Sequence, residues 1–290
     1  MGFDDWLNRA WDEHADDAAG VAARIAGEGL DAAAREPAQL AALARLAHHV
    51  FGEHLGRYDE GRALLARLAE RGAEPAALRA LDASLELSAG TRDPRPALSP
   101  SDRVRAAALA AGNLQERDAA RAARLLHEAI AEEESAGLAD DDPAVRSLAA
   151  NANNIACTLE EKPARTAAER ELMILAARTA RECWARAGTW LETERAEYRL
   201  AQTWLKAGDL VEARRHAQAC LEIVQANGDV PLEAFFGWEA LGLVERAAGN
   251  ATGHREALAR ATAAFERLDE ADRGWCRKSL EGLAALAAPG

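Results

Sequence analysis

The stretch Arg195–Leu221, RAEYRLAQTWLKAGDLVEARRHAQACL, carries the pattern that decides the fold. Its first half contains an apolar–small pair, Leu200-Ala201, and Gly208-Asp209 then interrupts the run. After this break, small residues recur at spacings of four and three, namely Ala213, Ala217 and Cys220. Such spacings place the small residues on one face of a helix. The stretch therefore predicts two helices joined by a tight turn.

The same pattern recurs three more times along the chain, once downstream and twice upstream. The four apolar–small pairs are 46, 45 and 41 residues apart and begin at Leu109, Ile155, Leu200 and Leu241. Each is followed by a break, and these are Arg117-Asp118, Lys162-Pro163, Gly208-Asp209 and Ala248-Gly249-Asn250. Small residues let two helices approach closely, and the remaining apolar faces are buried by stacking such units into a solenoid.

Composition supports an all-α protein. Hydrophobic residues make up 49% of the chain, but most of them are Ala and Leu, whereas β-branched and aromatic residues are scarce. This balance favours helix over sheet. The net charge of −13 repels phosphate groups, so we expect neither nucleic acid nor an anionic membrane surface as a partner.

Targeting signals and membrane spans are not predicted. The acidic start MGFDDWLNRAWDEHADD lacks the basic and apolar regions of a secretory signal, and no apolar run approaches the ~18 residues of a spanning helix. The four cysteines are scattered without CxxC spacing, as expected for a reduced, cytoplasmic protein.

Three features of these units resemble the tetratricopeptide repeat (TPR). They are the start Trp238-x-x-Leu241-Gly242, the Gly-Asp or Gly-Asn break and the Ala-rich second helix. The resemblance covers roughly residues 100–270, with units longer than the ~34 residues of a standard repeat. It implies a right-handed superhelical solenoid of antiparallel helix pairs. A last helix, predicted from Asp272 to Ala287, would cap this TPR-like array.

The N-terminal third is less regular. Its predicted elements are a helix pair within Phe3–Gly29 with a break near Ala15-Asp16, a helix Ala38–His54, a turn and helix within Gly56–Leu68, and a helix Pro75–Ala89. The Pro-rich stretch Gly90–Asp102 then predicts a loop or hinge, with Ser101-Asp102 capping the following helix. We therefore predict an irregular helical lobe (1–90), a linker (91–102) and a regular array with its capping helix (103–290).

Histidines and cysteines are the residues that could carry chemistry. His48, His49 and His54 lie in one predicted helix, and Glu53 lies four residues after His49, on the same helix face. However, the neighbouring His48 and His49 point about 100° apart, and zinc needs at least three converging ligands, so we expect no metal site. Each cysteine is interpreted as a small buried hydrophobe. Because no nucleophile-elbow, zinc-protease or phosphate-loop motif is present, we expect no catalytic residue and no cofactor.

Polar and aromatic residues follow the exposed side of the predicted first helices. In a TPR, as the resemblance implies, this side lines the concave surface that binds peptides. The predicted peptide-binding residues are Asn153, Asn154, Arg195, Tyr198, Arg199, Gln202, Lys206, Phe236 and Arg246. Tyr198, Phe235 and Phe236 have no place in the repeat pattern, and exposed aromatics are typical anchors of a binding surface.

Part of this stripe resembles the carboxylate clamp, in which TPRs hold the terminal carboxylate of a peptide. By repeat register, Asn154 matches a clamp Asn, and Arg195 and Arg199 match the cationic pair of the next repeat. Ala107 and Ala111 stand where a further Lys and Asn would be. Arginine donates bidentate hydrogen bonds to carboxylates. The alternative is that the two arginines pair with glutamates of their own helix on a solvated surface.

Three classes of function follow from these patterns. The first is a non-catalytic scaffold or adaptor that binds a protein or peptide, with an acidic segment or a free C-terminal carboxylate, on a concave TPR-like face. The second is a regulator that changes shape on binding a small molecule or signalling peptide, suggested by the Pro-rich hinge. The third, a metal-dependent enzyme, rests only on the histidines.

Overall fold

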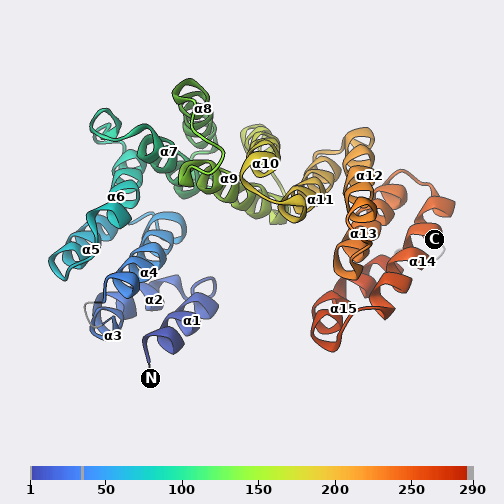
Figure 1. Ribbon diagram of the computed structural model, residues 1–290, viewed down its shortest axis with the longest axis horizontal. Coiled ribbons are helices and arrows are strands. Elements are labelled where there is room, and N and C mark those ends of the chain that lie inside the picture. The colour runs from blue at the N-terminus through green and yellow to red at the C-terminus, as the bar shows by residue number, and fades with distance from the viewer. Residues whose placement is uncertain (1, 34–35, 286–290) are drawn as a thin grey trace. The chain divides into compact units, whose positions relative to one another are not determined.

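The computed structural model describes residues 2–33 and 36–285, and these form helices and turns without any strand (Figure 1). The all-α prediction is confirmed for this part of the chain. Two compact units divide the protein, Met1–Ala152 and Asn153–Gly290. The boundary falls inside one long helix, α9 (Pro143–Glu161).

The first unit begins with short helices and continues with longer ones. Its elements are α1 (Phe3–Glu13), α2 (Ala18–Arg24), the π-helical turn η1 (Ile25–Gly29), α3 (Leu30–Ala32), α4 (Pro37–His48), the π-helical turn η2 (His49–His54), α5 (Tyr58–Glu70), α6 (Pro75–Ala89), the 3₁₀ turn η3 (Arg95–Ala97), α7 (Pro100–Leu114) and α8 (Ala119–Ala136). The predicted break near Ala15-Asp16 and the predicted helix Pro75–Ala89 are both found. The predicted helix Ala38–His54 is present as α4, but its last turn is the π-helical η2.

The Pro-rich stretch 91–102 lies inside the first unit, between α6 and α7, which pack against each other. The sequence-based division at this stretch and the division by packing at Ala152 therefore differ. The predicted cap is also corrected. Ser99, and not Ser101-Asp102, caps α7, because its hydroxyl accepts a hydrogen bond from the Asp102 amide at 3.2 Å. Pro100 then takes the first helical position, where its missing N–H costs nothing.

The second unit continues from the end of α9 with helices of similar length. They are α10 (Ala167–Ala187), α11 (Trp190–Ala207), α12 (Leu210–Ala226), α13 (Pro231–Ala247), α14 (Ala251–Glu266) and α15 (Glu270–Ala285). All four breaks predicted from the repeat fall between consecutive helices, from α7/α8 to α13/α14. The predicted capping helix is α15, although its predicted end at Ala287 lies outside the described residues.

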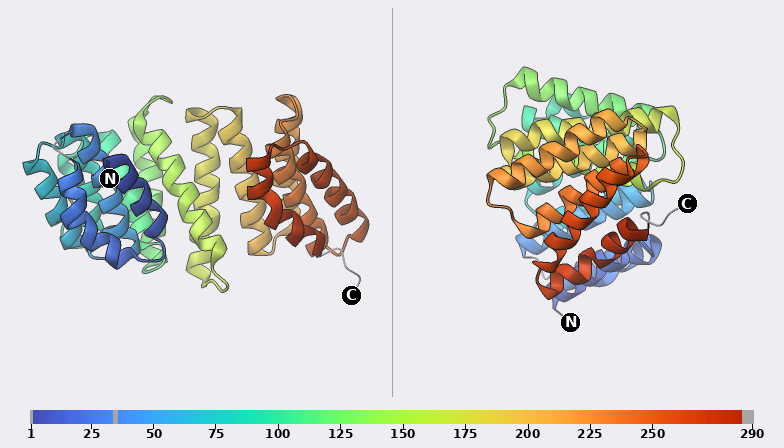
Figure 2. Two further views of the ribbon diagram at one scale, coloured as in Figure 1. Left: turned by 90° about the horizontal axis from the view of Figure 1, so that it is seen from below. Right: turned by 90° about the vertical axis from the view of Figure 1, so that its right-hand side faces the viewer.

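Consecutive helices of the second unit pack against one another, as in an α-solenoid (Figure 2). Helix α11 contacts α10, α12 and α13, and α15 packs on α13 and α14. The small residues of the repeat lie where the helices approach closely. A Cβ on Gly242 of α13 would lie 3.0 Å from a methyl carbon of Leu283 in α15 and 3.4 Å from Ala257 Cβ in α14. Within the described ranges, none of the helices combines the length and apolar character needed to cross a bilayer.

Candidate functional site

Helix α11 carries most of the predicted binding residues, and the residues at its N-terminus define where it begins. Thr189 and Glu192 form a capping box, in which each side chain accepts a backbone hydrogen bond from the other residue. The helix ends at Gly208, which takes a left-handed conformation with φ of 84°. These signals place the polar run of Arg195 and its neighbours in the middle of a well-defined helix.

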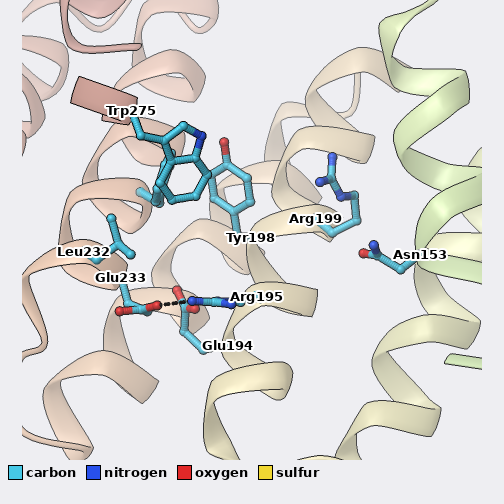
Figure 3. Close-up of a pocket in the computed structure, with 9 residues that line it drawn as sticks. Asn153, Glu194, Arg195, Tyr198, Arg199, Leu232, Glu233 and Trp275 are labelled. Carbon is cyan, nitrogen blue, oxygen red and sulfur yellow. Dashed lines mark hydrogen bonds and ion pairs between the residues drawn. The ribbon is translucent and has the colours of Figure 1, made fainter. Parts of the chain in front are cut away.

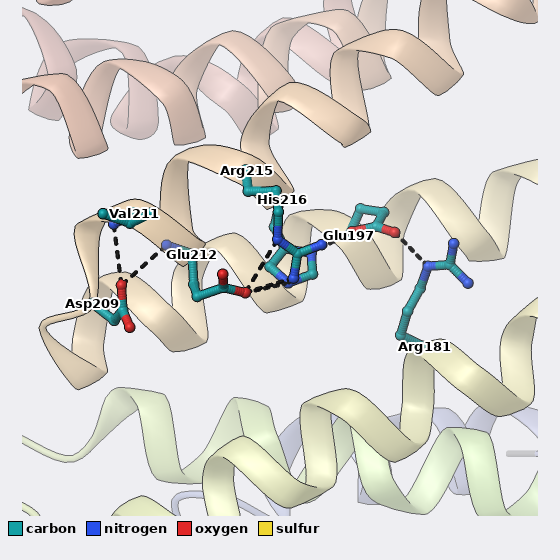
Figure 4. A network of polar contacts seen from close by, with 7 residues as sticks. All are labelled: Arg181, Glu197, Asp209, Val211, Glu212, Arg215 and His216. Atoms are coloured by element: carbon teal, nitrogen blue, oxygen red, sulfur yellow. Dashed lines mark hydrogen bonds and ion pairs between the residues drawn. The ribbon is translucent and has the colours of Figure 1, made fainter.

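A buried ionic network fixes α11 to the helices on either side (Figure 4). Glu197 of α11 accepts hydrogen bonds from Arg181 Nε of α10 at 2.6 Å and from His216 Nδ1 of α12 at 2.6 Å. Burial tends to raise the pKa of Glu197, but its bonds to His216 and Arg181 outweigh burial and lower the pKa. Asp209 also caps α12 by accepting from the Val211 amide. The network leaves α11 little freedom to rotate.

The residues next to Glu197 line a cavity of about 380 Å³ in the second unit (Figure 3). Helices α9, α11, α13 and α15 all contribute to it. Its lining residues are Asn153, Glu194, Arg195, Tyr198, Arg199, Leu232, Glu233, Phe236 and Trp275. Side chains that are far apart in sequence therefore meet at one site.

Both arginines of the cavity are paired with glutamates from other helices. Arg195 donates to Glu233 Oε1 of α13 at 2.7 Å, and its own side chain remains 58% exposed. Arg199 donates to Glu160 of α9, whose side chain is only 6% exposed. The sequence-based alternative, pairing within α11, is therefore not what the structure shows. These two cations are neutralised by carboxylates from neighbouring helices.

Aromatic rings form another part of the wall. The rings of Tyr198 and Phe236 have centroids 5.6 Å apart, and those of Phe236 and Trp275 are 5.1 Å apart. The Tyr198 hydroxyl donates to Glu239 at 2.9 Å, and burial together with this carboxylate raises its pKa. Trp275 is 66% exposed, which is unusual for such a large apolar side chain. Apart from its contact with Phe236, most of this apolar surface is left uncovered by the residues that the structure describes.

A second carboxyl group of the cavity is deeply buried. Glu194 accepts a hydrogen bond from the Cys220 thiol, with Sγ 2.7 Å from Oε1. Burial raises the pKa of Glu194 to about 7, with a further contribution from the nearby Glu233. Burial and Glu194 together raise the pKa of the Cys220 thiol. The cavity therefore contains a carboxyl group that is half protonated near neutral pH beside an inert thiol.

The structure separates the predicted binding residues into two groups. Those that line the cavity are Asn153, Arg195, Tyr198, Arg199 and Phe236. Those that do not are Asn154, Gln202, Lys206 and Arg246. Phe235, predicted as a surface anchor, is instead fully buried in a core cluster, where its ring centroid lies 6.1 Å from that of Phe265 in α14.

Sequence reasoning missed four lining residues, which are Glu194, Leu232, Glu233 and Trp275. Glu233 could have been found, because it lies three residues before Phe236 and therefore on the same helix face. Trp275 carried no such signal, since the repeat pattern assigned its helix only a capping role.

A different group of side chains could hold a metal ion. Among the described residues, His14, His49 and His54 of the first unit place one ring nitrogen each within 4.8 Å of the others. Local sequence groups His48, His49 and His54 in one helix, whereas the structure brings the distant His14 to His49.

No protein-family model, no curated protein and no solved structure matches this chain. The function of the cavity is therefore inferred from its own residues.

Proposed function

We propose that the second unit is a non-catalytic, TPR-like module that binds a peptide segment of a partner protein in the cavity beside α11. The observation that carries the proposal is the exposed Trp275 next to Phe236 and Tyr198. An exposed tryptophan at the edge of a preformed cavity is the type of residue that dominates binding energies at interfaces. An apolar side chain of the peptide would pack against Trp275 and Phe236.

Polar groups around the aromatic wall are suited to the rest of the peptide. Arg195 uses one terminal nitrogen on Glu233, so the remaining donors of its exposed guanidinium can reach a carboxylate. Asn153 offers an amide on the α9 side. We propose that these two residues hold a carboxylate of the peptide, either an acidic side chain or the free C-terminus. Glu233 and Glu194 on the same wall select against a second negative charge.

Two features support a role without catalysis. The buried Cys220 thiol, which donates to the lining residue Glu194, has a raised pKa and is therefore a poor nucleophile. Moreover, the histidine nearest to α11, His216, is committed to Glu197 at 2.6 Å on the network side of that helix. The Cys220 thiol does contact the Glu194 carboxyl group, but its raised pKa keeps it protonated, and His216 is not among the residues that line the cavity.

The test begins with a random peptide display selection against the full chain, followed by affinity measurements on synthetic peptides. Trp275→Ala is expected to weaken binding by about 2 kcal/mol, roughly 30-fold, as for an interface hot spot. Arg195→Ala should weaken peptides with a free C-terminus about tenfold and leave their amidated counterparts unchanged. Arg267→Ala is the matched control, because Arg267 forms an exposed pair with Asp229 away from the cavity.

Two results would contradict the proposal. One is selection of peptides whose affinity is the same for the wild-type chain and Trp275→Ala. The other is a loss of peptide affinity that is equally large in Trp275→Ala and in the Arg267→Ala control. Circular dichroism of each variant separates loss of binding from loss of fold, and Trp275 is exposed enough for its removal to leave the fold intact.

A further inference from the structure

A π-helical turn in the first unit places two histidines on one face. In an α-helix, residues five apart point about 140° away from each other. The chain from His49 to His54 is instead π-helical, as shown by the hydrogen bond from the Leu55 amide to the Val50 carbonyl at 3.0 Å. Because of this wider turn, His54 Nε2 lies 3.1 Å from His49 Nε2. Such π turns are frequent at functional sites.

A third histidine arrives from a distant part of the first unit. His14 follows directly after α1, and its Nε2 lies 3.1 Å from Nε2 of His49. A tetrahedral metal ion at about 2.0–2.1 Å from each ligand holds two ring nitrogens about 3.3–3.4 Å apart. The observed separations are close to this value. His49 Nε2 is therefore flanked by a ring nitrogen of His14 and one of His54, and each of the three histidines offers a ring nitrogen within 4.8 Å of the other two.

The hydrogen bonds made by Nδ1 of His14 and of His49 show which tautomer each neutral ring adopts. His49 Nδ1 lies 2.8 Å from Glu53 Oε2, and His14 Nδ1 bonds to the Trp11 carbonyl oxygen. Both partners only accept hydrogen bonds, so each Nδ1 carries a proton and each neutral ring presents a lone pair at Nε2. In their neutral forms the two rings place lone pairs 3.1 Å apart, which repel each other unless a proton or a metal ion lies between them. A metal ion would satisfy both at once, and His54 Nε2, 3.1 Å from His49 Nε2, lies close enough to bind the same ion.

The surroundings hold these histidines in place. Glu53, which orients His49, accepts a hydrogen bond from Gln115 Nε2 of α7 at 2.8 Å. Arg117 donates to the backbone carbonyls of Glu53 at 2.5 Å and His54 at 2.6 Å. A carboxylate on the far nitrogen of a ligating histidine is the usual outer partner in metal sites. The His49 side chain is 25% exposed, so water or another ligand can reach the same point.

We propose that His14, His49 and His54 form a binding site for one divalent transition-metal ion of the Zn²⁺ class, with Glu53 orienting His49. Imidazole ligands favour Zn²⁺, Co²⁺, Ni²⁺ and Cu²⁺ over Mg²⁺ and Ca²⁺. Three protein ligands leave a fourth position for a water molecule or a small anion. His48, the neighbour of His49, takes no part, because it is buried against Ser84 with Nε2 2.6 Å from the hydroxyl.

The test is a titration of the full chain with Zn²⁺, after removal of metal with a chelator, in competition with a chromophoric chelator of known affinity. One Zn²⁺ per chain is expected. His14→Ala and His49→Ala should each weaken binding on the order of 100-fold or more, and Glu53→Gln about 10–100-fold. His127→Ala is the control, because His127 is exposed on α8, and it should bind as the wild-type chain does.

The decisive variant is His14→Ala. If only the His49–His54 pair or a scattered set of surface histidines binds Zn²⁺, His14→Ala will match the wild-type chain and the proposal is overturned. A stoichiometry well below one overturns it too. Zn²⁺ should also raise the melting temperature of the wild-type chain and not that of His14→Ala, a comparison that remains valid if a variant is less stable. His14 is half-buried at a helix end, so its removal is compatible with folding.

Discussion

Removal of Arg199 should destabilise the second unit far more than removal of Arg195, although both arginines line the same cavity. Arg199 pairs with Glu160, which is buried near the C-terminal end of α9. A carboxylate at that end of a helix is disfavoured by the helix dipole. Arg195 pairs with Glu233, which lies in the first turn of α13, where the free amides and the dipole stabilise a negative charge.

The expected magnitudes follow from burial. Breaking a buried ion pair by removing one partner costs about 3–5 kcal/mol. The Arg199 side chain is 23% exposed, so water can partly replace it, and we expect about 3 kcal/mol for Arg199→Ala. The Thr203 hydroxyl still donates to Glu160 but carries no charge. For Arg195→Ala, whose side chain is 58% exposed, we expect less than about 1 kcal/mol.

The assay is urea unfolding of the full chain at pH 8 and pH 5, followed by tryptophan fluorescence, since most tryptophans lie in the second unit. Burial raises the pKa of Glu160 even in the presence of Arg199, and loss of Arg199 should raise it further. A raised carboxyl pKa means that the folded state binds the proton more tightly. The stability that the folded chain gains from protonated Glu160 is therefore present at low pH and lost as the pH rises. The cost of Arg199→Ala should thus be larger at pH 8 than at pH 5.

A double variant isolates the effect of the buried Glu160 charge on the free energy of unfolding. In Arg199→Ala/Glu160→Gln the buried carboxylate is gone, so about 2 of the 3 kcal/mol should be recovered at pH 8. Equal costs for Arg195→Ala and Arg199→Ala, or a cost for Arg199→Ala that does not change with pH, would refute the reasoning.

Two further predictions concern α11. Because the pKa of Glu194 is raised to about 7, its contribution to stability is complete below pH ~4.3 and disappears as the pH rises through 7. Glu194→Gln should flatten the unfolding free energy between pH 5 and 8, and a slope unchanged from the wild-type chain would contradict the assignment. Gly208→Ala should lower the unfolding free energy by about 1 kcal/mol, because Gly208 has a φ of 84° that costs other residues 1–2 kcal/mol. Gly274→Ala in α15, where a Cβ meets open space, is its control in denaturant unfolding.

Much of the fold was predictable because its signals are local. The apolar–small pairs, the turn residues and the caps lie within one helix pair, so spacing alone placed the breaks at Gly208-Asp209 and Ala248-Gly249-Asn250. The predicted cap of α7 was wrong by two residues, because Ser99 and Ser101 flank Pro100 and each offers a hydroxyl group. The π-helical η2 was not predictable from a pattern that assumes 100° per residue.

The cavity was predictable only in part. Periodicity places Arg195, Tyr198 and Arg199 on one side of α11, and the structure shows that all three line the cavity. The partners of the two arginines were not predictable from the sequence. Glu160 lies 39 positions from Arg199, and Glu233 lies 38 positions from Arg195, each on another helix. The sequence showed cations on a stripe, but the carboxylates that neutralise them are contributed by packing.

The sequence by itself determined that this protein is helical and where most of its helices begin and end, because helix propensity, apolar period and capping act within a few residues. Only the tertiary structure decided which charges are paired and which side chains converge. Trp275 reaches the cavity, and His14 reaches His49, through contacts between helices that no local spacing encodes. Binding sites depend on such contacts, since burial and pairing change what a carboxylate, a guanidinium or an imidazole can do.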